Sequence, residues 1–320
     1  MPSPLDWHLN TQKKGARRPS DLPHPPFVHS TDGSGSAEAV ARAWLRGRSS
    51  AIAGHDGGGA QSQRLPAAPG AQSQTPKKIP ETDAIFANLH EKDRQAREGG
   101  QTKRLSRDGK ATVNIGDYSR GGETLGDHQA ADHEMGCQEK HTPFGLLDED
   151  GGQLDLAFDS SAKTSDFIAD SLYDGWERLP PDERQKFTRL PIKTDNGPES
   201  NGRRTQFLKR MVAFADHIGK PIQLLYDPPY HSKYNPVERC WGILEKHGNG
   251  TQLVNAETML GWAKSMTWKG IHPVVELSRK VYQKGVSLSK EAMQDIEARL
   301  VRNPLLPKWD ILIQPACLMV

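Results

Sequence analysis

The feature that most constrains this chain is the order of strand-like and helix-like segments between residues 104 and 250. Three apolar segments come first, at 104–116, 141–150 and 153–161, and an Asp-Gly-Gly turn joins the last two. These segments predict a three-stranded antiparallel meander. Helix-like and strand-like segments then alternate, which predicts a mixed sheet covered by helices. This is the element order of an RNase H-like fold, so we predict an α/β protein of that class.

The helices are predicted from apolar residues at helical spacing and from residues that favour helix ends. Segment 203–220 carries apolar residues at helical spacing from Phe207 to Ile218 and contains Gly219, a frequent C-terminal cap. Segment 234–250 has Pro236 in its first turn and Gly248 near its end. We also predict helices over 80–100 and 164–179, and short buried strands over 190–195 and 221–227.

Composition divides the chain into three regions. Residues 1–76 are rich in Gly, Ser, Pro, Gln and Ala, which bury little apolar surface, so we predict a largely irregular or degenerate region. Residues 77–250 are predicted to form the RNase H-like domain. Residues 251–320 are predicted to form a helical C-terminal extension packed on it, with helices over 255–266, 272–285 and 289–302 and a final strand near 309–315. The formal charge is only +2, so nucleic-acid binding would depend on local basic patches.

Cysteine usage and hydropathy exclude several classes of protein. Cys137, Cys240 and Cys317 are far apart and lack C-x-x-C spacing, which argues against a disulfide framework and favours a reducing compartment. Cys240 with His231 and His247 is the best zinc combination, but its spacing matches no zinc-ligand pattern. No apolar run approaches the roughly 18 residues of a membrane span. We therefore expect a soluble cytoplasmic protein without a membrane partner.

Three acidic residues lie where an α/β sheet collects ligands. Asp108 is on the first predicted strand, Asp195 ends the fourth, and Glu238 is in the first turn of the helix after the fifth. The 43 residues from Asp195 to Glu238 leave room for a helix, a strand and a turn back to the same sheet edge. Carboxylates suit two hard divalent cations, which can promote phosphoryl transfer. The alternatives are solvated surface charge, a dipole-complementing role for Glu238, and Glu245 as its rival.

Several motifs resemble the Rhodopirellula-type DDE transposases of bacterial insertion sequences, in the RNase H-like and retroviral integrase superfamily. The most specific are TDNGPESNGRRTQFLKRMVAFAD at 194–216 and PPYHSKYNPVERCWGILEKHGNG at 228–250. IGDYSRGG at 115–122 and RNPLLPKWDILIQP at 302–315 are also similar to that family. The resemblance runs from about residue 77 to about residue 315 and so covers three-quarters of the chain.

The resemblance implies a DDE catalytic domain that binds two Mg²⁺ or Mn²⁺ ions through Asp108, Asp195 and Glu238. It implies metal-dependent cleavage at the terminal inverted repeats of a mobile element and strand transfer into target DNA. It also implies a homo-oligomer on DNA, associated with the bacterial nucleoid. Asp117 and Asp132 are alternatives for the first carboxylate, and the strand argument favours Asp108 because Asp117 follows a strand-breaking glycine.

Basic and polar residues near the two most specific motifs are predicted to contact DNA. Arg203, Arg204, Lys209 and Arg210 form a basic cluster in the first half of the 203–220 segment, and the first three are predicted to contact DNA. His231 and Lys233 follow a Pro-Pro-Tyr turn just before the helix of Glu238. The alternatives are a solvated helix face for the cluster and a rigid proline turn for the loop.

Two departures from the family pattern support another hypothesis. Residues 1–76 do not resemble the helix-turn-helix segment that such proteins carry for recognising transposon ends. Gly248 stands where the family pattern has an aromatic residue. A catalytically impaired transposase remnant that at most binds DNA is therefore one alternative. An RNase H-like nuclease that acts on RNA–DNA hybrids is another.

Overall fold

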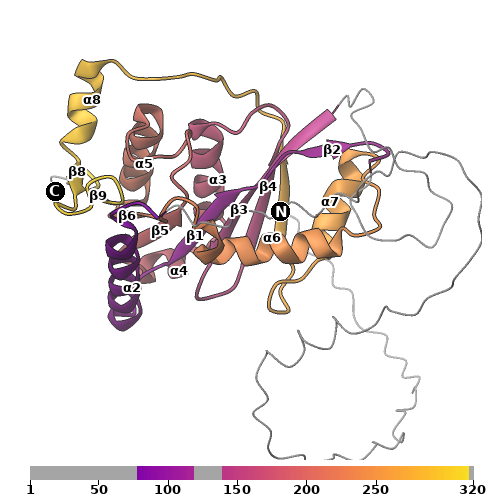
Figure 1. The fold of residues 1–320 in the computed structure, drawn as a ribbon, viewed down its shortest axis with the longest axis horizontal. Helices are drawn as coiled ribbons and strands as arrows, with labels where there is room; N and C mark the ends of the chain where they lie inside the picture. The colour runs from indigo at the N-terminus through magenta and orange to yellow at the C-terminus, as the bar shows by residue number, and fades with distance from the viewer. Residues whose placement is uncertain (1–77, 119–138, 317–320) are drawn as a thin grey trace, which may run out of the picture. The chain divides into compact units, whose positions relative to one another are not determined.

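The computed structural model describes residues 78–118 and 139–316. Within these residues one mixed sheet contains nine strands (Figure 1). The strands are β1 (Leu105–Gly109), β2 (Val113–Ile115), β3 (Glu139–Asp148), β4 (Leu154–Asp159), β5 (Leu190–Thr194), β6 (Ile222–Tyr226), β7 (Val274–Ser278), β8 (Leu300–Arg302) and β9 (Asp310–Ile313).

Helices cover both faces of the sheet (Figure 1). The helices are α2 (Thr82–Gly99), α3 (Ser165–Glu177), α4 (Pro181–Lys186), α5 (Thr205–Ile218), α6 (Pro236–His247), α7 (Ala256–Ser265) and α8 (Lys290–Glu297), with a 3-10 turn η2 (Ser232–Tyr234) before α6. Helices α3 and α5 pack together on one face, and α6 lies against β1 and β3 on the other. The predicted helix signals are confirmed: Thr164 caps α3 by accepting from the Phe167 amide, and Gly219 ends α5 with φ of 64°.

The strand order is β7-β4-β3-β1-β5-β6-β9-β8, and β2 also pairs with β3. β1, β3 and β4 pair antiparallel, whereas β1, β5 and β6 pair parallel. Three antiparallel strands therefore lead into two parallel strands, each reached through helices, as right-handed crossover connections require. This arrangement confirms the predicted RNase H-like α/β class.

Alternation along β1 determines which side chains meet α6. Asp108 pairs with Gly145 of β3, and a Cβ built on Gly145 would lie 2.9 Å from the Trp241 ring of α6. Cross-strand partners share a face, so Asp108 and Ser106 point toward α6. Arg107 points toward α3 and α5, where its guanidinium lies 5.3 Å from the Phe207 ring centroid. The glycine at position 145 thus allows α6 to approach the strand that carries Asp108.

Two expectations for the chain after residue 250 were wrong in detail. Segment 272–285 was expected to be helical, but it contains β7, which pairs parallel with β4. The unpaired edge of β4 and the β-branched pair Val274 and Val275 outweigh the helical spacing of the apolar residues. The helix predicted near 289–302 ends at Glu297, and β8 follows. This region therefore contains two helices and three strands, and its final strand was predicted correctly.

Some predictions fall outside the described residues. These are the irregular region at 1–76, the alternative carboxylate Asp132, and two of the three cysteines. Cys240 is a free and buried thiol. The domain boundaries remain predictions. In the described part of the chain, no helix combines the length and apolar character needed to cross a membrane.

Candidate active site

Three neighbouring parallel strands bring acidic residues to one edge of the sheet. The registers of β1 with β5 and of β5 with β6 align the ends of these strands. Asp108 lies near the end of β1, Asp195 directly follows β5, and Asp227 directly follows β6. The Asp227 amide donates to the Thr194 carbonyl at 3.0 Å, and this bond holds the ends of β5 and β6 beside each other. Asp227 was not singled out from the sequence.

Glu238 reaches this edge because the start of α6 is tied to β1. The Asn235 side-chain amide donates to the Arg107 carbonyl at 3.0 Å, and the Ser106 hydroxyl bonds the Asn235 side-chain oxygen. The same Ser106 oxygen accepts from the Val237 amide at 3.0 Å. Asn235 makes no side-chain cap to its own helix. Its function is to fix the first turn of α6, which carries Glu238, to the strand of Asp108.

Burial and the charges of both other predicted carboxylates act on Asp108. Its side chain is largely buried, and burial is the main cause that raises its pKa to about 6. The charges of Asp195 and Glu238 raise this pKa further, while Lys163 opposes them. The Trp241 indole Nε1 donates to Asp108 Oδ2 at 3.2 Å. Trp241 is also a buried core residue, and its contact with Asp108 was not predicted from the sequence.

Asp195 lies beside two hydroxyl groups and one buried guanidinium group. Ser200 Oγ donates to Asp195 Oδ1 at 3.3 Å, and Thr194 Oγ1 lies 3.4 Å from the same oxygen. The Arg107 guanidinium nitrogen lies 3.7 Å from Asp195 Oδ1. The Arg107 side chain is 0% exposed, and all three of its guanidinium nitrogens lack hydrogen-bond partners among the described residues. Burial therefore lowers the pKa of Arg107, although Asp195 opposes the shift.

The rival acidic residues have different surroundings. Asp117 is exposed beyond β2 and is not among the charges that act most strongly on Asp108. Glu245 pairs with Lys110 at 2.8 Å. On a helix its Cα lies about 10 Å along the axis from that of Glu238. These surroundings favour Asp108 and Glu238 over the two rivals.

Carboxylate oxygens are the type of ligand that hard divalent cations such as Mg²⁺ and Mn²⁺ prefer. Three carboxylates that repel one another form a charge pattern that a bound cation relieves. Across residues 78–118 and 139–316, however, no three His, Cys, Asp or Glu side chains converge closely enough to hold an ion. Asp108, Asp195 and Glu238 therefore do not form a closed metal-binding pocket in this structure. The same result gives no support to a zinc site at Cys240, His231 and His247.

The residues predicted to contact DNA have different exposures. Arg203, Lys209 and Lys233 are exposed, and Arg204 is half-buried. His231 is only 8% exposed, its ring packs edge-on against Phe86 at 5.4 Å, and its Nδ1 lies 2.8 Å from the Pro229 carbonyl. The surroundings of His231 are therefore those of a residue that stabilises the loop before α6.

The strand order and the carboxylates at adjacent strand ends define the class of RNase H-like nucleases and polynucleotidyl transferases. The family model described as Rhodopirellula transposase DDE domain matches residues 67–315. The chain therefore belongs to this family of transposase DDE domains. The match begins ten residues before the boundary expected from the sequence.

Solved structures similar to the chain include Mos1 transposase complexes. A pre-cleavage Mos1 transpososome shares 12% identity at a TM-score of 0.43, over 70% of this chain and 61% of that chain. The Mos1 mariner paired end complex with Mn shares 12% identity at a TM-score of 0.42, over 71% and 62% of the two chains. The chain thus spans less than two thirds of the length of those proteins. No curated protein matches it.

Proposed function

We propose that this protein is a transposase that cleaves DNA at transposon ends and joins the ends to target DNA, with Asp108, Asp195 and Glu238 as its catalytic carboxylates. The observation that carries the proposal is the geometry that brings β1 with Asp108, the end of β5 before Asp195 and the first turn of α6 with Glu238 to one edge of the sheet, where both other charges raise the pKa of Asp108. Three acidic groups from three separate elements share one sheet edge. Acidic residues that serve only as solvated surface charge have no reason to gather at one edge of a sheet.

Each residue has a distinct proposed task. Asp108, Asp195 and Glu238 would hold two Mg²⁺ or Mn²⁺ ions, which supply activation of the attacking oxygen and charge neutralisation at the leaving oxygen. Trp241 orients the Asp108 carboxylate through its 3.2 Å contact. Ser106 and Asn235 keep the first turn of α6 on β1. The chain positions charge and forms no covalent link to DNA.

DNA of the element's terminal inverted repeats and target DNA are the proposed substrates, and a homo-oligomer on paired ends is the proposed assembly. Nicking of a terminal-repeat duplex in Mg²⁺ or Mn²⁺ tests the proposal. Asp195→Asn and Glu238→Gln should each lower the nicking rate at least about a hundredfold, because each removes a metal ligand. Equal nicking by the wild type and both variants would refute the assignment.

Two matched controls separate these carboxylates from their rivals. Glu245→Gln changes an acid on the same helix as Glu238 and should keep nearly full activity. Asp117→Asn tests the alternative first carboxylate and should also keep activity, whereas Asp108→Asn should lose it. Activity lost in Asp117→Asn but kept in Asp108→Asn would move the first carboxylate to Asp117.

A second candidate function is DNA binding without catalysis. One observation favours it: the buried Arg107 guanidinium already lies 3.7 Å from Asp195, where it competes for the charge that a metal ion needs. In that case the wild type would bind terminal-repeat DNA and show no metal-dependent nicking. Restoration of nicking by Arg107→Met would then identify Arg107 as the cause.

A further inference from the structure

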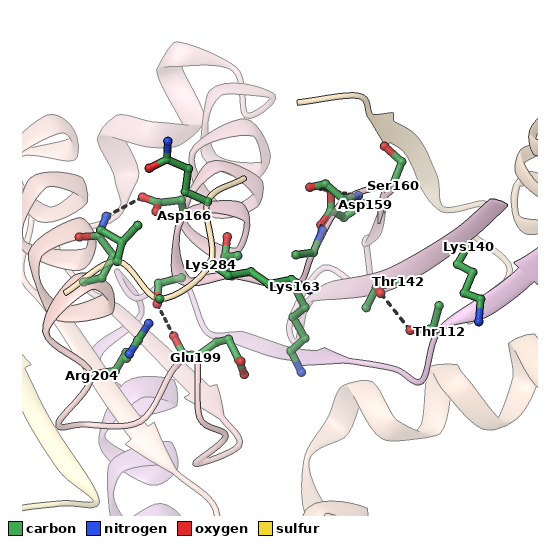
Figure 2. A pocket seen from close by; sticks show the side chains of 18 of the residues that line it. Thr112, Lys140, Thr142, Asp159, Ser160, Lys163, Asp166, Glu199, Arg204 and Lys284 are labelled. Carbon is green, nitrogen blue, oxygen red and sulfur yellow. Dashed lines mark hydrogen bonds between the residues drawn. The ribbon is translucent and has the colours of Figure 1, made fainter. Parts of the chain in front are cut away.

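A polar groove lies beside Asp108 and is separate from the three carboxylates. Its volume is about 820 Å³, within the range of about 300–1,000 Å³ that is usual for ligand sites. Figure 2 shows Lys163 near its middle, with Arg204 toward one end and the Thr112–Thr142 pair toward the other. The walls come from the β1–β2 turn, the β4–α3 turn, the segment before α5 and residues 283–286.

Charge in the groove is positive and partly uncompensated. Five basic and three acidic residues line it. Lys163, Arg204 and Lys284 have no ion-pair partner among residues 78–118 and 139–316. Two of the lining acids are engaged: Asp159 accepts from the Ser161 and Ala162 amides, and Asp166 accepts from Gln206 at 2.8 Å. An anionic ligand would therefore meet three available cations.

The remaining lining groups suit phosphate rather than bases. Six Ser and Thr residues line the groove: Thr112, Thr142, Ser160, Ser161, Thr164 and Ser165. Hydroxyls and cations are the usual partners of backbone phosphates, whereas bases are held by aromatic stacking. No aromatic side chain lines this groove in the part of the chain that the structure describes. The chemistry therefore favours a sugar–phosphate backbone bound without regard to sequence.

Lys163 connects the groove to the carboxylates. A Cβ built on Gly109, the residue after Asp108, would lie 2.7 Å from Lys163 Cε and Nζ. The Lys163 stem therefore crosses the backbone directly after Asp108, and its charge acts on that carboxylate. An anion bound at Lys163 lies next to the site of proposed chemistry.

We infer that this groove binds the backbone of the DNA strand adjoining the reacting phosphate, with Lys163, Arg204 and Lys284 each neutralising one phosphate. The inference rests on the proposed function, because it assigns the DNA path at the same site. Arg204 is the only one of the three that was predicted from the sequence to contact DNA.

Binding of a fluorescent duplex with a single-stranded 3′ end, measured by anisotropy in EDTA over a range of salt concentrations, tests the inference. Loss of three phosphate contacts should reduce the slope of log Kd against log salt by about two to three, at roughly 0.7–0.9 for each contact. The triple variant Lys163→Gln/Arg204→Gln/Lys284→Gln should show this reduction. The matched control Lys186→Gln/Lys220→Gln/Lys290→Gln removes the same charge elsewhere and should change the slope by much less.

An equal slope change in both triple variants would overturn the inference, because it would mean that only total charge matters. Inorganic phosphate that competes with DNA at equal phosphate concentration would also overturn it, in favour of a simple anion site. If the triple variant does not fold, the single variant of the exposed Lys284 should still lower the slope by about 0.7–0.9. Nicking by the wild type with an unchanged slope in the variants would refute the groove and leave the proposed function intact.

Discussion

Arg107 is the residue with the least favourable surroundings in the site. Its fully buried guanidinium makes no hydrogen bond within the described residues and has one carboxylate at 3.7 Å. A buried charge carries a desolvation penalty of several kcal/mol, and the Asp195 side chain that Arg107→Met leaves behind is 28% exposed, so removing the Arg107 charge should stabilise the protein by about 1–4 kcal/mol. We expect Arg107→Met to raise the free energy of unfolding by that order, measured by urea denaturation.

The double variant Arg107→Met/Asp195→Asn provides the control for this prediction. If Arg107 mainly restrains Asp195, the two single changes will not be additive. A lower free energy of unfolding in Arg107→Met would contradict the prediction and show that the contact with Asp195 outweighs the burial cost.

The raised pKa of Asp227 determines the direction in which the free energy of unfolding should change with pH. Burial is the main cause that raises its pKa to about 8, with Lys193 opposing and Glu149, Asp195 and Asp108 adding to the shift. Between about pH 4 and about pH 8 the folded state keeps a proton that the unfolded state releases. The free energy of unfolding should therefore fall as pH rises through this window, and Asp227→Asn should reduce that fall.

Denaturation at about pH 5 and about pH 8 checks the Asp227 prediction. The variant should gain stability relative to the wild type at the higher pH and differ little at the lower one. Asp117→Asn, at an exposed position, is the control and should keep the wild-type pH dependence of the free energy of unfolding. An unchanged dependence in Asp227→Asn would exclude this residue as its source.

At the scale of single residues, the sequence carries more signal for the proposed carboxylates than for the residues that surround them. Asp195 and Glu238 stand in motifs with specific spacing, and Asp108 follows from its strand. Ser106, Lys163 and Asp227 carry no local signal, because their contacts depend on which strands become neighbours. In the sequence, Arg107 is one of several charged residues in a predicted strand. Only the alternation of side chains between the two faces of β1 explains why it points into an apolar core.

Among the elements, α6 depends on the tie between its first turn and β1. Ser106 accepts from the Val237 amide and bonds Asn235. Ser106→Ala would leave both groups without this partner, at a cost of about 1–3 kcal/mol, and would let Glu238 move. We expect Mn²⁺ affinity, measured by calorimetry, to fall about tenfold or more.

Ser171→Ala is the matched control for Ser106→Ala. Ser171 is also buried, and its hydroxyl donates to the Phe167 carbonyl within α3. This variant should lose some stability but keep its Mn²⁺ affinity. If both variants lose affinity equally, the tie between β1 and α6 has no special role in positioning Glu238.

Two glycines test how closely α6 approaches the sheet. Gly145→Ala places a methyl group 2.9 Å from the Trp241 ring, and overpacking of this kind costs about 1–3 kcal/mol. Gly242→Ala in α6 meets nothing within 4 Å and should instead stabilise the helix by about 0.5–1 kcal/mol. Thermal denaturation should show opposite signs. Equal signs would mean that α6 does not approach β3 this closely.

The elements before residue 250 were predictable because each carried its own signal, such as the Thr164 cap of α3 or Gly219 after α5. β7 was missed because its strand conformation is decided by the open edge of β4, about 115 residues earlier in the chain. Gly248 also has a tertiary explanation. A Cβ there would lie 3.1 Å from the Trp262 ring, so Trp262 of α7 occupies the space into which a larger residue would project.

For the whole molecule, the repulsion among the carboxylates predicts that metal binding and folding are coupled. A cation that binds only the folded state adds about 2.7 kcal/mol of stability at one hundred times its Kd. We expect Mn²⁺ to raise the melting temperature of the wild type and EDTA to reverse the increase. Asp195→Asn should remove most of the increase, whereas Glu245→Gln should keep it. An increase of equal size in Asp195→Asn would place the bound ion elsewhere.

The position of β9 beside β6 has a consequence for a form of this protein that is shortened by an early stop codon. β9 pairs antiparallel with β6, the strand that leads directly into Asp227. A polypeptide that stopped near residue 300 would retain every proposed catalytic carboxylate but would leave the backbone of β6 unpaired along one side, where strands of other chains could add and aggregate. In such a truncated protein the proposed activity would be lost through insolubility, although all three proposed carboxylates would still be present in its sequence.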